Sequence, residues 1–141
     1  MVVLWSLVVA CGGANGTNGA APVGEPVAAA PVAAAPAVRS TDSAALKSAL
    51  DSAHVPILVD VRTPEEFASG HVPGAKSIPL NQLMSELGAL EPYKGGEVWL
   101  ICESGGRSAR AAAQLSSQGF TTVNVGDGTS GWRNAGFPLD K

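Results

Sequence analysis

The sequence has few cysteines, few aromatic residues and few charges, and these shortages narrow the classes of protein that it can encode. Only Cys11 and Cys102 are cysteines, and a disulfide between them would have to close across a long low-complexity stretch, so we expect none. Aromatic residues make up 5% and charged residues 15% of the chain. No basic run and no interleaving of basic with aromatic residues occurs, so nucleic acid is not an expected partner.

The first ten residues have the character of a secretory signal peptide. Residues 2–10, VVLWSLVVA, are apolar but too few to span a bilayer as a helix. The order Val8-Val9-Ala10-Cys11 resembles the lipobox of bacterial lipoproteins, which are cut before the cysteine and lipidated on its thiol. The resemblance implies a lipid on Cys11 and an extracytoplasmic, membrane-anchored location. No Lys or Arg precedes the apolar run, so a hydrophobic N-terminus without this role stays open.

Residues 11–37 are predicted to be a tether between the lipidated cysteine and a domain at 38–141. The segment consists almost entirely of small residues, and its prolines are Pro22, Pro26, Pro31 and Pro36. Proline removes amide donors and interrupts helices, while Ala and Gly offer little surface to bury. At about 3 Å per residue, such a tether reaches on the order of 80 Å. A low-complexity leader without a role is the alternative. Gly12, directly after the lipidated cysteine, resembles the residue found there in lipoproteins that are sorted to an outer membrane.

The remaining residues alternate short apolar runs with helical patterns. Strands are predicted for the apolar runs at 56–62, 76–80, 97–102 and 121–125. Helices are predicted at 41–50, 63–70, 81–87 and 107–119. Three glycines before Trp132 predict a loop there. The alternation favours an α/β domain in which helices cover both faces of a parallel sheet and functional residues gather at the carboxyl ends of the strands.

The clearest local signal is the start of the helix at 63–70. Thr63 fits the N-cap, Pro64 the first helical position and Glu66 the partner in a capping box, and Gly70 fits the stop. Asp60 lies near the carboxyl end of the preceding predicted strand, close to this helix. We expect Asp60 to hydrogen-bond the loop that follows the strand at 97–102 or an arginine, or else to serve as a structural cap.

Cys102 lies where a predicted buried strand meets the start of a helix. A thiol reacts as its thiolate, and three features favour ionisation here: the amides of the helix start, the charges of Arg107 and Arg110, and a Gly105-Gly106 pair that can turn successive N–H groups inward. Glu103 opposes them, with a weak effect if it points to solvent. Alternatively, Cys102 is a buried core residue, as most free cysteines are.

Three segments resemble the single-domain rhodanese family of sulfurtransferases: VDVRTPEEFASGHVPGAKSIPL at 59–80, CESGGRS at 102–108 and GWRNAGFPL at 131–139. The middle one matches the family's active-site pattern Cys-x-x-Gly-x-Arg-Ser. They occur in the family's order, and the resemblance of the whole domain extends over about 100 residues. The resemblance implies a five-stranded parallel sheet flanked by helices, and it implies neither a cofactor nor a metal.

The resemblance also implies a reaction. Cys102 would attack the sulfane sulfur of a small anionic donor such as thiosulfate, and the resulting persulfide would pass its outer sulfur to a thiol or a cyanide-like acceptor. Arg107 would fix the loop and attract the donor, and Arg62 is expected to be a structural ion-pair partner. The residues expected to bind the persulfide are Glu103, Ser104, Gly105, Gly106, Arg107 and Ser108. We expect a monomer.

Three other functions stay open on the sequence alone. Phosphatases and arsenate reductases of the same family carry five residues between Cys and Arg, whereas four separate Cys102 from Arg107 here, which fits a sulfur atom better than a tetrahedral anion. A catalytically weak binding or regulatory module is the second. The third is a redox sensor, which would need a thiol from another molecule because the domain offers no second cysteine.

The remaining aromatic and histidine residues are expected to be structural. His71 lies in a segment with the composition of a turn, and we expect it to have a structural role rather than to transfer protons. His54 is expected at the surface. Trp99 and Trp132 are expected in the core.

Overall fold

The computed structural model describes residues 37–141, so the predicted signal peptide and nearly all of the predicted tether lie outside the described residues. The strands of this part are β1 (Val38–Thr41), β2 (Ile57–Asp60), β3 (Lys76–Ser77), β4 (Glu97–Ile101) and β5 (Thr121–Val125). The helices are α1 (Ser43–Leu50), α2 (Pro64–Ser69), α3 (Leu87–Leu90), the 3-10 turn η1 (Glu91–Tyr93), α4 (Gly106–Ser117) and α5 (Gly128–Asn134). None of the helices described is both long enough and apolar enough to cross a membrane.

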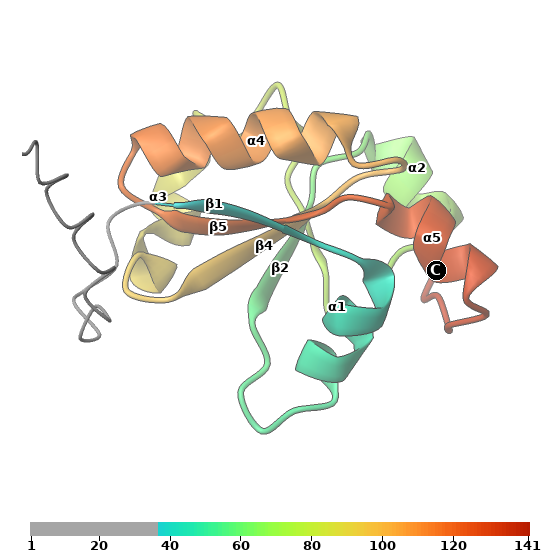
Figure 1. Ribbon diagram of the computed structural model, residues 1–141. Coiled ribbons are helices and arrows are strands. Elements are labelled where there is room, and N and C mark those ends of the chain that lie inside the picture. Colours follow the sequence, from blue (N-terminus) through green and yellow to red (C-terminus); the bar gives the residue numbers. More distant parts are fainter. Residues whose placement is uncertain (1–36) are drawn as a thin grey trace, which may run out of the picture. The chain divides into compact units, whose positions relative to one another are not determined.

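The five strands form one parallel sheet in the order β1-β5-β4-β2-β3 (Figure 1). β5, β4 and β2 lie in its interior, and the helices cover both faces, with α4 on one side and α1 on the other (Figure 1). This architecture confirms the predicted α/β class and the five-stranded parallel sheet. The helices between the strands make parallel pairing possible. Two parallel strands need a long connection, because the chain must return to the end of the sheet at which the first strand began.

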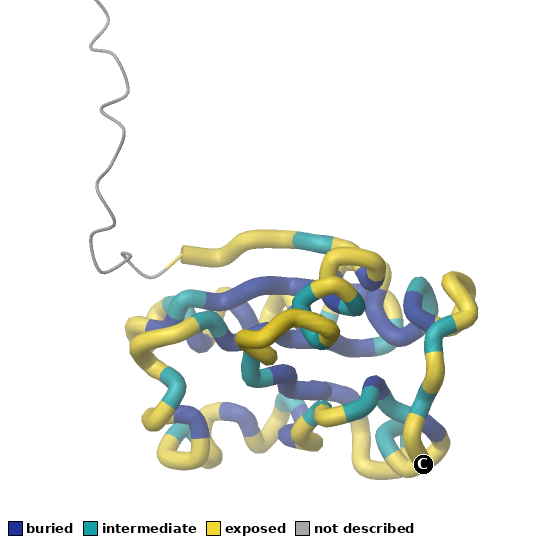
Figure 2. The backbone as a smooth tube through the Cα atoms, turned by 90° about the horizontal axis from the view of Figure 1, so that it is seen from below, coloured by how far each residue is buried: buried dark blue, intermediate teal, exposed yellow. Residues whose placement is uncertain are grey.

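Alternating side chains of the central strands fill two separate cores. In β4, Val98 and Leu100 face a core shared with α4, whereas Trp99 and Ile101 face a core shared with α1 and α5. Successive residues of a strand point to opposite faces, and both faces are covered, so the strand is apolar throughout. The central strands are accordingly the most buried part of the chain (Figure 2). The predicted core positions of both tryptophans are confirmed, since Trp132 belongs to the second core.

The structure differs from the sequence-based predictions in three places. The first is an edge strand near the N-terminal end of the described residues, where the sequence predicts no strand. Residues 38–41, VRST, form the edge strand β1, which pairs only with β5 and is mostly exposed. Polar residues on an exposed edge strand show no apolar run, so the sequence pattern gives no strand signal there.

The second difference lies before β4. The helix predicted at 81–87 is a series of tight turns, and the helix α3 begins only at Leu87. The carbonyl of Gln82 accepts from the backbone N–H groups of Ser85 and Glu86 and from the Ser85 hydroxyl, at 3.0, 3.0 and 2.7 Å. A serine hydroxyl that binds a nearby carbonyl competes with the regular helix pattern.

The third difference is the glycine-containing segment before Trp132, which forms the helix α5 rather than a loop. Its first amides bind backbone carbonyls of the β4–α4 loop: Thr129 N donates to Cys102 O at 2.8 Å and Ser130 N to Glu103 O at 3.0 Å. Burial of Trp132 adds apolar contacts on the other side of the helix. Tertiary contacts thus outweigh the low helix propensity of glycine.

Candidate active site

The carboxyl ends of β2 and β4 place Asp60 and Cys102 at the same edge of the sheet. Asp60 pairs with Ile101 in the register of the two strands, and Val61 N donates to Ile101 O at 2.9 Å. Cys102 follows directly and begins the loop to α4. The sequence predicted that both residues lie at strand ends, and the topology makes those ends neighbours.

The Cys102 thiol is buried, with 1% of the residue exposed, and the loop wraps around its sulfur. Gly105 N donates to Sγ at 3.1 Å, and the Ser108 hydroxyl lies 3.4 Å from Sγ. Burial raises the pKa of Cys102, but the hydrogen bonds from the Ser108 hydroxyl and from the backbone amides of Ser108, Ser104 and Arg107 outweigh it, so the pKa lies below that of an ordinary thiol. The loop therefore favours the thiolate.

Glycine is required at Gly105. Its φ of +85° lies in the left-handed region, and a Cβ built there would sit 2.0 Å from the carbonyl oxygen of Gly126. The neighbouring Gly106 has no such constraint, since nothing lies within 4 Å of a Cβ at that position. The turn at Gly105 is what brings its own amide back onto the sulfur of Cys102.

The first residues of α5 bind the backbone carbonyls at the beginning of this loop. The carbonyl of Cys102 accepts from both the N–H and the hydroxyl of Thr129, at 2.8 and 3.1 Å. Ser130 N binds the next carbonyl, that of Glu103, at 3.0 Å. With these two carbonyls bound to α5, the amides that follow remain free to turn toward Sγ.

Arg107 fixes the far end of the loop to α2. Its two terminal nitrogens donate to the two carboxylate oxygens of Glu66, each at 2.7 Å. Glu66 also completes the predicted capping box: Thr63 N donates to its carboxylate at 3.1 Å, and Thr63 Oγ1 accepts from Glu66 N at 3.3 Å. Hydrogen bonding to Arg107 lowers the pKa of Glu66 to about 2, and the same contact raises the pKa of Arg107. This bidentate pair is the geometry that guanidinium and carboxylate groups favour.

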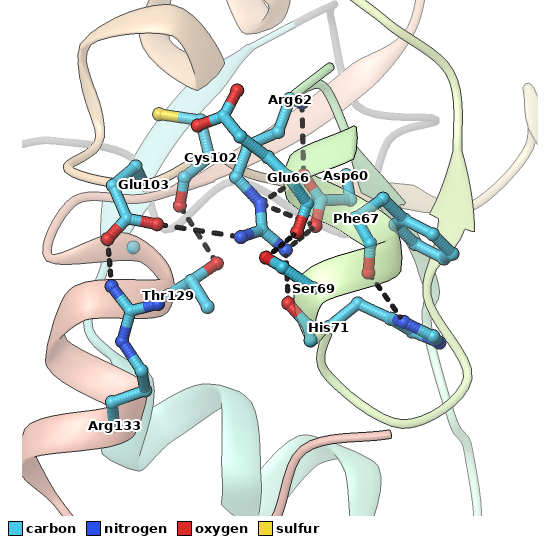
Figure 3. A network of polar contacts seen from close by, with 12 residues as sticks. Asp60, Arg62, Glu66, Phe67, Ser69, His71, Cys102, Glu103, Thr129 and Arg133 are labelled. Carbon is cyan, nitrogen blue, oxygen red and sulfur yellow. Dashed lines mark hydrogen bonds and ion pairs between the residues drawn. The ribbon is translucent and has the colours of Figure 1, made fainter. Parts of the chain in front are cut away.

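A second arginine, Arg62, is buried beneath the loop in a chain of polar contacts (Figure 3). Its Nε lies 3.0 and 2.9 Å from the two oxygens of Asp60, and its NH2 donates to Asp60 at 2.6 Å and to the carbonyl of Gly70 at 2.8 Å. Burial lowers the pKa of Arg62, but the bond to Asp60 and the charges of Asp60 and Glu103 outweigh it, so the pKa is raised. Asp60 thus binds an arginine, which is one of the roles expected of it. Arg62 is an ion-pair partner, as expected from the sequence.

Glu103, the residue after the cysteine, bridges two arginines rather than pointing freely to solvent (Figure 3). Arg62 NH1 lies 3.5 Å from one of its oxygens, and Arg133 of α5 donates to the other. The side chain of Glu103 is 34% exposed. Its negative charge next to the thiol is therefore balanced by ion pairs, and not only screened by water.

Sequence reasoning missed Arg133 and the second role of Glu66. Arg133 lies inside the segment GWRNAGFPL, and the sequence pattern assigns Glu66 only to the helix cap. Each contact joins residues far apart in the chain, 30 positions for Arg133 with Glu103 and 41 for Arg107 with Glu66. Neither pairing has a periodic signal in the sequence.

His71 lies at the end of α2 and has a structural environment. Its Nδ1 is 3.1 Å from the carbonyl oxygen of Phe67, and the two rings stack with centroids 3.8 Å apart. Its backbone pairs with Asp140 in an isolated bridge. These contacts agree with the predicted structural role, and His54 is exposed as predicted.

Taken together, the fold and the site define a class: a parallel α/β domain with a buried thiol held by loop amides at the carboxyl edge of the sheet. The model of the Rhodanese-like domain family matches residues 42–135. The chain therefore belongs to the rhodanese-like domain family.

Known proteins agree with this assignment. A protein named "Sulfurtransferase" from Allochromatium vinosum is 34% identical over 103 residues, which cover 72% of this chain and 94% of that protein. The thiosulfate sulfurtransferase PspE of Escherichia coli is 36% identical over 70 residues, covering 50% of this chain and 67% of PspE. The crystal structure of a rhodanese-like domain protein from Staphylococcus aureus superposes with a TM-score of 0.66 at 32% identity, covering 73% and 99% of the two chains. These relatives support a rhodanese-type enzyme in general.

Proposed function

We propose that this protein transfers sulfane sulfur from thiosulfate or a related anionic donor to a thiol or cyanide-like acceptor, through a persulfide on Cys102. The observation that carries the proposal is the contact of Gly105 N with Cys102 Sγ at 3.1 Å, within a loop that lowers the pKa of the thiol. The lowered pKa enlarges the fraction of thiolate, and a thiolate needs no general base to attack. One relative is named a thiosulfate sulfurtransferase, which supports thiosulfate as a donor to test first.

The two half-reactions follow from the thiolate. Sγ attacks the outer sulfur of thiosulfate, the S–S bond breaks, and sulfite leaves with the electron pair of that bond, so Cys102 becomes a persulfide anion. The acceptor then attacks the outer sulfur and the thiolate returns. The amides that hold Sγ lie where they can also bind the persulfide, whose charge sits on the outer sulfur.

The size of the loop supports sulfur over phosphate chemistry. Four residues separate Cys102 from Arg107, and the guanidinium of Arg107 is bound in a bidentate pair by Glu66. The phosphatases and arsenate reductases of the same family carry five residues there, so the present loop is one residue shorter than theirs.

The test is intact-mass measurement of the full chain after exposure to thiosulfate, with Cys102→Ser as control. We expect the wild type to gain the mass of one sulfur atom, to lose it again on addition of cyanide with release of thiocyanate, and the control to gain nothing. An unchanged mass with every sulfane-sulfur donor would favour a binding module. Hydrolysis of an aryl phosphate that Cys102→Ser abolishes, without thiocyanate formation, would overturn the proposal in favour of a phosphatase.

We further propose that the protein is exported and anchored to the extracytoplasmic face of a bacterial membrane by a lipid on Cys11. The support is the apolar run followed by Val8-Val9-Ala10-Cys11. In a bacterial host, labelled palmitate should enter the wild type and not Cys11→Ser. Wild-type protein that remains unlabelled in the soluble fraction would contradict the anchor.

A further inference from the structure

The three arginines that contact the Cys102 loop or its neighbours are all paired with carboxylates. Arg62, Arg107 and Arg133 each contact a carboxylate, and those carboxylates belong to Asp60, Glu66 and Glu103. These ion pairs carry no net charge as a group. With its arginines already paired, the site offers a dianionic donor such as thiosulfate less attraction than a site with an unpaired arginine would.

Glu103 is the member of this group that stands directly beside the nucleophile. Its carbonyl is bound by Ser130 N at 3.0 Å, and its carboxylate is bound by Arg62 and Arg133. Backbone and side chain are therefore both held, and the carboxylate cannot swing far from the loop. Arg62 is buried and remains paired with Asp60, whereas the side chain of Arg133 is 46% exposed and pairs only with Glu103 among the described residues.

We propose that Glu103 determines donor specificity by occupying Arg133, so that the site discriminates against dianionic donors and selects organic persulfides that bear a single negative charge at the sulfur. This inference rests on the proposed sulfurtransferase function. In the selected reaction, the Cys102 thiolate attacks the outer sulfur of R–S–S⁻, the S–S bond breaks, and R–S⁻ leaves with the electron pair, so that Cys102 carries the persulfide anion. Charge and atoms balance, and no redox partner is needed.

The kinetic test compares thiosulfate with freshly prepared cysteine persulfide as donors for Glu103→Gln. The glutamine keeps the shape of the side chain, removes its charge and leaves Arg133 available. We expect the KM for thiosulfate to fall roughly three- to tenfold with little change in kcat, and the effect to shrink at high salt. The KM for cysteine persulfide should change much less.

Two variants serve as controls. Glu97→Gln makes the same charge change at an ion pair with Arg39 at the start of β4, at the opposite end of that strand from the nucleophile, and should leave both KM values unchanged. Arg133→Gln should raise the KM for thiosulfate, and the double variant Glu103→Gln/Arg133→Gln should lose most of the gain of Glu103→Gln. If the ion pair between α5 and the loop is purely structural, these substitutions should change kcat and stability, and the ratio of the KM for thiosulfate to the KM for cysteine persulfide should stay the same.

A second measurement does not depend on turnover. The rates at which anionic iodoacetate and neutral iodoacetamide alkylate Cys102, followed on the peptide that contains it, report the charge that a reagent meets at the sulfur. Glu103→Gln should raise the iodoacetate-to-iodoacetamide ratio roughly two- to fivefold, and Glu97→Gln should not. An unchanged ratio overturns the role of Glu103 even if sulfur transfer is normal. If the ratio rises but the chain forms no persulfide, the charge effect of Glu103 is supported and only the proposed sulfurtransferase function is refuted.

Discussion

The ion pair between Glu66 and Arg107 ties the catalytic loop to α2, and the substitution Glu66→Gln tests how much it stabilises the fold. Glutamine can still serve as the last residue of a capping box, so the cap with Thr63 is largely kept while the charge is lost. What the substitution removes is the charged, bidentate contact whose two distances are both 2.7 Å.

The size of the effect follows from the pKa of Glu66, which falls from 4.5 to about 2 in the folded protein. At about 1.4 kcal/mol for each factor of ten, this corresponds to roughly 3 kcal/mol. Both side chains are about one-third exposed, at 35% for Glu66 and 36% for Arg107, so solvent screens the pair. We therefore expect Glu66→Gln to lower the free energy of unfolding by about 1–2 kcal/mol at neutral pH.

The pH dependence has a definite sign. A carboxylate whose pKa is depressed on folding contributes stability above its unfolded pKa, near 4.5, and loses that contribution as the pH falls toward 2. The stability difference between wild type and Glu66→Gln should therefore be full at neutral pH and shrink progressively below about pH 4.5. Urea unfolding at neutral pH and at about pH 3 measures the difference directly.

Glu65→Gln is the matched control, because Glu65 is an exposed acidic residue in the same first turn of α2. It removes the same charge near the same helix end, so any dipole effect is shared. If Glu66→Gln costs no more than Glu65→Gln at neutral pH, or if its cost is the same at pH 3, the reasoning about the Arg107 pair is wrong.

Three further predictions concern the loop and its support. Ser108→Ala should raise the pKa of Cys102, because a hydrogen bond to the thiolate is lost, and should shift the pH profile of alkylation by iodoacetamide to higher pH; an unshifted profile would contradict that bond. Gly105→Ala should unfold the loop or destabilise the domain by about 2 kcal/mol or more. Gly106→Ala, where a Cβ meets nothing within 4 Å, should be nearly neutral in urea unfolding. Similar costs for the two substitutions would refute the steric argument. Asp60→Asn removes the carboxylate closest to the buried Arg62 and leaves only the 3.5 Å contact with Glu103 to balance the charge of that arginine. The substitution should cost about 3–5 kcal/mol, measured in the same way, and a cost below about 1 kcal/mol would show that the pair is not effectively buried.

The parts of the site that could be predicted from the sequence depend on residues close together in the chain. The start of α2 needs only Thr63, Pro64 and Glu66, which lie within one turn, and the capping box is present as predicted. The strand that ends at Cys102 is marked by its unbroken apolar run, since both of its faces are covered. The sharp turn at Gly105 likewise follows from a local property, because glycine alone lacks the Cβ that hinders such a turn.

The parts that could not be predicted depend on which distant segments the sheet brings together. The helix α5 contains three glycine or threonine residues in its first four positions, a composition typical of a loop. It is helical because its amides bind the carbonyls of the catalytic loop and because Trp132 fills the core below it. A local pattern cannot register these contacts, since both partners lie elsewhere in the chain.

The sequence by itself determined the α/β architecture, the edge of the sheet at which the thiol lies and the four-residue spacing between Cys102 and Arg107. These features follow from periodicity, steric limits and covalent spacing, which act over a few residues. Only the tertiary structure decided what the charges around the thiol do. It pairs Arg107 with Glu66 and places Glu103 between Arg62 and Arg133. Ion pairs between residues 30 or 41 positions apart carry no periodic signal along the chain and are chosen by proximity in space, so the electrostatic balance of this site exists only once the domain has folded.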